Sequence, residues 1–288
     1  MVRLDVAPRM ELMGDSAVLH WGDETFKIPR LKHGILFVMS GYIGSQLYGC
    51  EYKVHLDYMR GRIVNRSILD GLIEHSRQLG VDEEGLGIEL GWNPVLINRG
   101  EEGVYFFNER MRNWIGYADF SKPYIQEASL VMVRRDIPIL GLPDLVINVD
   151  GKPAYIIELK TTGGPRRTRS LMTRELLQAE SYYHMMRYLG LDPKGVAVVK
   201  IVRGTDFRII DNMELIIKYM ENGDDDLVML TSNVALHKIK VRSFDDFLKD
   251  VDYALDYWLG LRNPRPNPSR RLCSSCEHRK RCPYSAVK

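Results

Sequence analysis

The sequence predicts a mixed α/β fold, and three observations support this prediction. Short aliphatic runs with the length of β-strands are interspersed along the chain with longer segments of helical periodicity. The 288 residues are 45% hydrophobic and 27% charged, as is usual for a globular protein with a buried core. The longest apolar stretch, GILFVMSGYIG at 34–44, is much shorter than the roughly 20 residues that a membrane span requires.

Each expected element has its own local signal. A hairpin is expected over 18–28, with its turn at Gly22-Asp23. Aliphatic and β-branched residues predict strands at 130–134, 144–149, 154–160 and 195–202. Apolar residues at helical spacing predict helices at 67–79, 170–189 and 243–261. Asn65 and Ser243 are expected N-caps, and Gly190 is expected to end the second of these helices.

Charge is unevenly distributed, although 40 basic and 38 acidic residues nearly balance. A basic stretch without acids extends from Lys160 to Arg174 and includes Arg166, Arg167 and Arg169. The tail from Arg262 onward has eight basic residues and one acid. Such polarity suits a site for a polyanion, here the phosphates of DNA. Two solvated surface loops are the alternative interpretation.

The most informative chemical pattern is Gly141-Leu-Pro-Asp144 followed by Glu158-Leu-Lys160. Residues two apart on a strand share a face, so Glu158 and Lys160 point the same way. A loop of three or five residues between the strands would place Asp144 directly opposite Glu158, at about 5 Å between Cβ atoms. Two carboxylates this close repel each other unless a cation lies between them. Mg²⁺ or Mn²⁺ fits, so the pattern suits metal-assisted phosphodiester hydrolysis, with Lys160 orienting or deprotonating a water.

Three further patterns accompany this pair. His75 follows Gly71 on the first predicted helix and shares its inward face. Gln178 and Tyr182 are four apart on the next helix, so amide and phenol share one face. The cysteines occur as Cys50 and, more than 200 residues later, a closing C-x2-C-x5-C motif. That motif comprises Cys273, Cys276 and Cys282.

Four cysteines so placed indicate an intracellular metal or cluster site rather than a disulfide scaffold. The N-terminus shows no secretory signal, so a cytoplasmic location is expected. Structural zinc sites usually combine two local pairs of ligands, whereas here one cysteine is remote and three are local. This arrangement favours an iron–sulfur cluster, while zinc, with His278 as a spare ligand, remains the alternative.

Taken in order, these motifs resemble the PD-(D/E)XK nucleases of the RecB type, and more narrowly the CRISPR-associated Cas-four exonuclease family. The resemblance covers about Cys50 to Cys282. It implies a restriction-endonuclease-like core, a mixed β-sheet flanked by helices. An N-terminal extension at 1–45, a nuclease core at 46–262 and a cysteine tail at 263–288 closed by Cys50 are the expected parts. The chain is longer than most members of that family.

The resemblance also implies a role for each matching residue. Asp144, Glu158 and Lys160 would be catalytic, and His75, Asp144 and Glu158 would be the ligands of Mn²⁺ or Mg²⁺. Gln178 and Tyr182 would contact DNA near the site. Cys50, Cys273, Cys276 and Cys282 would hold a 4Fe-4S cluster. The arginines at 166, 167 and 169 are expected, from charge alone, to bind phosphates.

The function expected from these inferences is a metal-dependent DNA exonuclease that prefers single strands or frayed ends and also cuts internally. It would process DNA for CRISPR spacer acquisition, in company with the CRISPR integrase proteins. Two alternatives stand beside it. The same chemistry could serve recombination or repair, and a non-catalytic scaffold could hold an adaptation complex together. The buried charges of the catalytic set argue against the scaffold, because they cost folding free energy.

Overall fold

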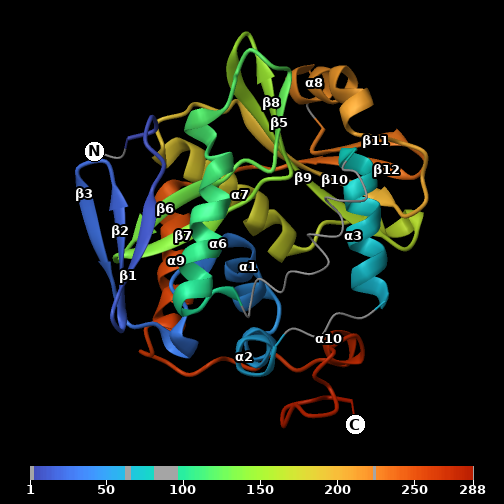
Figure 1. Ribbon diagram of the computed structural model, residues 1–288. Coiled ribbons are helices and arrows are strands. Elements are labelled where there is room, and N and C mark those ends of the chain that lie inside the picture. Colours follow the sequence, from blue (N-terminus) through green and yellow to red (C-terminus); the bar gives the residue numbers. More distant parts are fainter. Residues whose placement is uncertain (1–2, 62–65, 81–96, 223–224, 288) are drawn as a thin grey trace.

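The computed structural model describes residues 3–61, 66–80, 97–222 and 225–287, and it has the mixed α/β architecture expected (Figure 1). A six-stranded sheet has the order β11-β12-β10-β9-β8-β5, and two three-stranded sheets have the orders β1-β2-β3 and β4-β7-β6. The strands of the six-stranded sheet are β5 (Tyr124–Gln126), β8 (Leu145–Val149), β9 (Lys152–Thr162), β10 (Gly195–Val202), β11 (Leu227–Thr231) and β12 (Val234–Lys238).

The two smaller sheets lie on the side of the molecule where Figure 1 marks the N-terminus. Their strands are β1 (Arg9–Met13), β2 (Ser16–Trp21), β3 (Glu24–Ile28), β4 (Val38–Met39), β6 (Leu130–Arg134) and β7 (Ile137–Gly141). The predicted hairpin is confirmed, with its turn at Gly22-Asp23, and β1 adds a third strand that the sequence analysis missed. Leu19 and Trp21 belong to the same buried cluster as Phe37 and Trp258, so this sheet packs on the main core.

Helices cover both faces of the six-stranded sheet. They are α1 (Ser40–Tyr48), α2 (Glu51–Arg60), α3 (Arg66–Leu79), α6 (Gly100–Arg110), α7 (Thr173–Tyr188), α8 (Met213–Asn222), α9 (Phe244–Trp258) and α10 (Arg270–Ser274). Short 3₁₀ turns occur at Lys32–Gly34, Met111–Asn113, Ile115–Tyr117, Pro165–Arg167 and Ile210–Asn212. Helix α7 connects the parallel strands β9 and β10 as a βαβ crossover.

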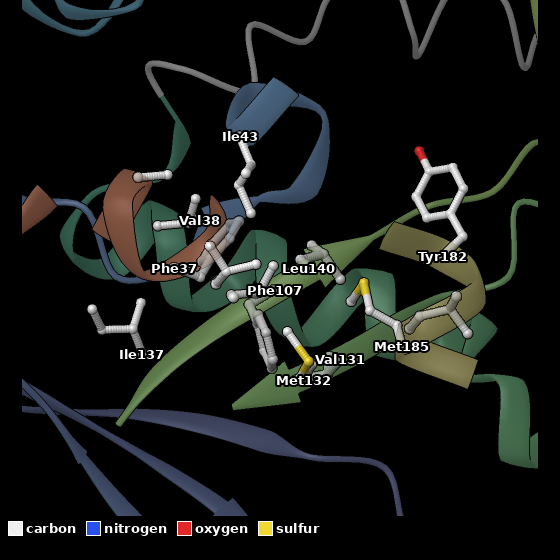
Figure 2. Packing of buried hydrophobic residues seen from close by; sticks show 14 of the residues in the cluster. Phe37, Val38, Ile43, Phe107, Val131, Met132, Ile137, Leu140, Tyr182 and Met185 are labelled. Atoms are coloured by element: carbon white, nitrogen blue, oxygen red, sulfur yellow. The ribbon is translucent and has the colours of Figure 1, made fainter. Parts of the chain in front are cut away.

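The core divides by the alternation of side chains along β9. Ile156 points into a large cluster that includes Leu177 and Tyr182 of α7. Ile157 and Leu159 point into a second cluster with Leu79 of α3 and Ile216 of α8. Glu158 and Lys160 therefore share the α7 face with Ile156. Figure 2 shows part of the first cluster, with the Tyr182 hydroxyl at its edge and directed away from the neighbouring apolar side chains.

The predicted elements are largely confirmed. The strand at 195–202 has the predicted bounds, and Ser243 caps α9 by accepting a hydrogen bond from the Asp246 amide at 3.1 Å. The helix expected over 170–189 begins later, at Thr173, because 163–172 form a loop over the sheet. Asn65, the expected cap of α3, lies outside the described residues. None of the helices in the described ranges is both long and apolar enough to cross a membrane.

Candidate active site

The β8–β9 hairpin determines where the two carboxylates lie. Asp150 and Gly151 form its two-residue turn with φ values of 53° and 70°, the left-handed conformation that an Asp-Gly turn favours. Val149 pairs with Lys152 directly beside the turn. At the end of the hairpin away from the turn, Leu145 pairs with Ile157. Continuing that register by one residue places Asp144 opposite Glu158.

This register depends on a β-bulge, and not on the loop of three or five residues that was the condition considered from the sequence. Asn148 pairs with Pro153 and Ile147 pairs with Tyr155, so Ala154 is an extra residue on β9. A two-residue turn alone would have placed Asp144 opposite Ile157 and on the other face from Glu158. The bulge adds the one residue that returns both carboxylates to a shared face.

Asp144 is fixed by two contacts from different elements. Its Oδ2 accepts a hydrogen bond from the Leu159 amide at 2.5 Å, and its Oδ1 lies 2.9 Å from Nε2 of His75 on α3. Burial alone would raise the pKa of Asp144, but the charge and hydrogen bond of His75, together with Lys160 and the Leu159 amide, outweigh it. The pKa of Asp144 therefore lies below its usual value, and the group stays ionised.

Glu158 lies deeper, with its side chain 3% exposed. Its Oε1 accepts a hydrogen bond from Lys160 at 2.5 Å, while its Oε2 is buried without a hydrogen-bond partner among the described residues. Burial, followed by repulsion from Asp144, raises the pKa of Glu158 to about 7. An unpartnered buried carboxylate oxygen beside a second carboxylate is a place where a cation would be stabilised.

The donor set has the chemistry of a site for a hard divalent cation, namely two carboxylates and an imidazole. As the side chains stand, no three His, Cys, Asp or Glu residues within the described ranges are placed to hold a metal ion. Instead, His75 contacts Asp144, and one oxygen of Glu158 accepts a hydrogen bond from Lys160. The structure thus brings together all four residues that the sequence analysis singled out at this centre.

Lys160 links the carboxylates to α7. Its Nζ lies 2.5 Å from Glu158 and 3.0 Å from Oε1 of Gln178, whose amide nitrogen donates to the Tyr182 hydroxyl at 2.8 Å. Burial would lower the pKa of Lys160, but the two carboxylates outweigh it and the pKa is raised. Lys160 is therefore a cation here and is not poised to accept a proton from a water.

Tyr182 is only 2% exposed, and its ring is part of the apolar core. Burial, then repulsion from Glu158 and Asp144, raises its pKa well above the usual value. Its hydroxyl, rather than the face of its ring, contacts Gln178 beside the site, and Figure 2 shows this hydroxyl directed away from the labelled apolar side chains. A stacking contact between this ring and a base therefore does not fit the structure.

The predicted phosphate-binding arginines lie on an exposed loop at 163–172. Arg166, Arg167 and Arg169 are exposed there, next to the end of β9. Two buried side chains hold the loop from beneath, because His237 contacts the Thr168 carbonyl at 2.6 Å and Lys200 donates to the Ser170 carbonyl at 2.8 Å.

Lys200 also pairs with Glu175 at 2.9 Å, and it is the register partner of Lys160 across β10 and β9. This buried ion pair was not predicted from the sequence. Its signal was a single lysine inside the otherwise apolar strand GVAVVKIV, which requires an anionic partner when buried.

The four cysteines line one cavity of about 920 Å³, here called the cysteine cavity. All four are free thiols, and burial raises the pKa of Cys276. The cavity walls come from α2 and the tail, with Arg174 of α7 at one side. His278, the spare zinc ligand of the sequence analysis, is buried and contacts Asp57 at 2.7 Å. It therefore serves the packing of the tail against α2.

The tail is also held by contacts that involve no thiol. Glu51, fully buried directly after Cys50, accepts two hydrogen bonds from the Arg262 guanidinium at 2.5 and 2.6 Å. It also accepts one from the Arg265 amide at 2.7 Å. Asn267 donates to the Gly49 carbonyl at 2.9 Å. The Pro-rich segment before the cysteines is thus fixed to the start of α2, which explains why chain segments more than 200 residues apart meet here (Figure 1).

A second cavity of about 520 Å³, here called the central cavity, lies between α1, α2 and α7. Lys160, Gln178 and Tyr182 line it, while Asp144, Glu158 and His75 lie just outside its lining. Lys160 therefore stands between this cavity and the two carboxylates.

The family model described as the PD-(D/E)XK nuclease superfamily matches residues 91–283, a span that contains Asp144, Glu158 and Lys160. His75 and Cys50 precede the matched span. Among solved structures, the crystal structure of SSO0001 is similar at 16% identity with a TM-score of 0.35, covering 81% of this chain and 95% of that one. No curated protein matches the chain.

Proposed function

Because the chain belongs to the PD-(D/E)XK nuclease superfamily, we propose that it hydrolyses phosphodiester bonds of DNA at Asp144, Glu158 and Lys160. The observation that carries this proposal is the convergence of the two carboxylates and the lysine from β8 and β9 on one point. Nucleases of this superfamily generally use Mg²⁺ or Mn²⁺. His75, Asp144 and Glu158 would hold that ion, with the unpartnered oxygen of Glu158 as one donor.

The bound ion would polarise the scissile phosphate and a water molecule. The protein's own groups prepare the rest. The Leu159 amide holds the Asp144 carboxylate in one orientation. The entropic cost of fixing this carboxylate is therefore met when the protein folds and does not add to the barrier of the reaction. Lys160, kept cationic, is placed to stabilise the negative charge that develops on the phosphate oxygens. Gln178 keeps the ammonium group in position and ties it to Tyr182.

Within this activity we propose an exonuclease that prefers single-stranded or frayed DNA and also cuts internally, processing DNA for CRISPR spacer acquisition beside the integrase proteins. The arginine loop at 163–172 supports a phosphate contact next to the site. The four cysteines would hold a 4Fe-4S cluster, which is supported by their sharing one cavity. Recombination or repair would use the same chemistry, and neighbouring genes distinguish these pathways.

The test is cleavage of end-labelled single-stranded and double-stranded DNA with Mn²⁺, comparing the wild type with Asp144→Ala. The variant should lose cleavage and keep the circular dichroism spectrum of the wild type. Arg187→Gln, a change at an exposed ion pair with Asp192 at the far end of α7, is the matched control and should cut normally. Equal rates for Asp144→Ala and the wild type would refute the assigned centre.

A further inference from the structure

The two cavities adjoin each other and together outline a path between the catalytic centre and the tail. Five residues line both the cysteine cavity and the central cavity, and among them are Cys50, Lys53 and Arg174. One end of this path is at Lys160 beside the carboxylates, and the other is among the cysteines of the tail. A chain-like substrate that enters at one end would pass the shared residues on its way to the other.

Arg174 is the residue of this shared segment that continues the catalytic row. It precedes Gln178 by four residues and Tyr182 by eight on α7, so the three side chains share one helix face. All three line the central cavity. Four helical residues span about 6 Å, which places Arg174 one or two nucleotides along a strand from Gln178.

The position of Arg174 is set by close packing between α1 and α7. A Cβ at Gly44 of α1 would lie only 2.6 Å from the Arg174 carbonyl oxygen, so only glycine allows this approach. Gly41 similarly faces the Gln178 amide. The backbone that carries the arginine is thus held against α1, while the side chain itself is exposed.

The charge of Arg174 is available to a ligand, unlike that of the other cations in the central cavity. Lys53 is bonded to Asp57 at 2.8 Å and lies 3.5 Å from Glu277. Lys160 is bonded to Glu158. Arg174 makes no ion pair with any residue in the described ranges, although it lies among these compensated charges. An arginine with its planar fork free in a cavity suits a phosphate group.

We propose that Arg174 binds a backbone phosphate of single-stranded DNA and directs the strand from the catalytic centre toward the cysteine cavity. This inference rests on the proposed function and extends it by naming the path of the substrate. It assigns to Arg174 a role in binding that precedes the chemical step. The arginine loop at 163–172 lies outside both cavities, so its contribution should be separable from that of Arg174.

The experiment measures binding of a fluorescein-labelled oligo(dT) to the full-length protein in metal-free buffer, as a function of salt. Each phosphate contact on a single strand contributes about 0.7 to the slope of log K against log salt. Arg174→Gln should lower that slope by about 0.7, and Arg174→Lys should restore most of it. Arg187→Gln, on the same helix but outside both cavities, should leave the slope unchanged.

The outcomes separate this inference from the proposed function. If Arg174→Gln binds with the wild-type slope while Asp144→Ala abolishes cleavage, the path is wrong and the nuclease assignment stands. If Arg174→Gln and Arg187→Gln lose affinity equally, the effect is one of general surface charge and the inference is also wrong. If the wild-type protein cuts no DNA, the proposed function itself fails.

Discussion

Asp144 is bonded through its carboxylate to the amide of Leu159, the neighbour of the other catalytic carboxylate, at 2.5 Å. One acid is thereby attached to the main chain of the strand that presents the second. The spacing between Asp144 and Glu158 follows from backbone geometry, and side-chain rotation has little influence on it. This relationship holds two acidic groups side by side in a mostly apolar hairpin.

Glu158→Gln should make the metal-free protein more stable at alkaline pH. Because the pKa of Glu158 is about 7 in the folded protein and 4.5 is its reference value, the folded state binds the proton more tightly than the unfolded state does. The stability contributed by this proton is present below pH 4.5 and is lost as the pH rises through 7, at about 1.4 kcal/mol per unit of pKa shift.

Urea unfolding between pH 4 and pH 9 in a chelating buffer checks this expectation. The wild type should lose stability across that range relative to Glu158→Gln, while the variant should be inactive as a nuclease. Parallel pH profiles for the two proteins would contradict the burial of an ionisable group at this position.

His75→Ala should weaken metal binding without changing the fold. The imidazole contacts Asp144 at 2.9 Å and is 21% exposed, so water can reach the space that its removal leaves. The Mn²⁺ concentration for half-maximal cleavage should rise by about tenfold or more. His20→Ala, on the distant β2 strand, is the control. An unchanged Mn²⁺ requirement would make His75 a packing residue only.

Lys200 and Glu175 should show strong coupling in a double-mutant cycle. Both are nearly fully buried, so Lys200→Met alone leaves an unpaired carboxylate and should cost about 3–5 kcal/mol. The double variant Lys200→Met/Glu175→Gln should recover most of that loss, because glutamine can still accept the hydrogen bond from the Met172 amide. Additive losses in chemical unfolding would rule out the coupling.

The cysteine cavity should contain iron when the protein is purified without oxygen. The purified protein should be brown with stoichiometric iron, and Cys276→Ser should be pale. The tail of that variant should nevertheless resist limited proteolysis, because Glu51 and Arg262 hold it without any thiol. Colourless wild-type protein that contains zinc would reject the cluster.

The sequence was sufficient for the elements whose patterns are local. The β9 and β10 strands and the capped helix α9 are apparent from aliphatic runs and from Ser243. Helix α1 was missed because SGYIGSQLY carries its glycines for contact with α7 and not for helix propensity. Strands β11 and β12 were missed as well, since they add to the edge of the sheet through pairing with a distant partner, β10.

The same distinction applies to the site. The order of Asp144, Glu158 and Lys160 in the chain was enough to nominate them, because strand alternation is a local rule. The burial of Tyr182 and the availability of Arg174 depend on how α1 packs against α7, and no pattern within either helix encodes this. The Ala154 bulge was equally hidden, because a bulge leaves no reliable mark on the sequence around it.

Because of that bulge, the same number of paired residues separates the turn from Asp144 and from Glu158. With Ala154 paired into a regular ladder instead, Asp144 would lie opposite Ile157 and away from the face of Glu158, with every bond angle still ideal and the centre gone. A change of one residue between Asp144 and Glu158 can preserve the centre only where it creates or removes a bulge.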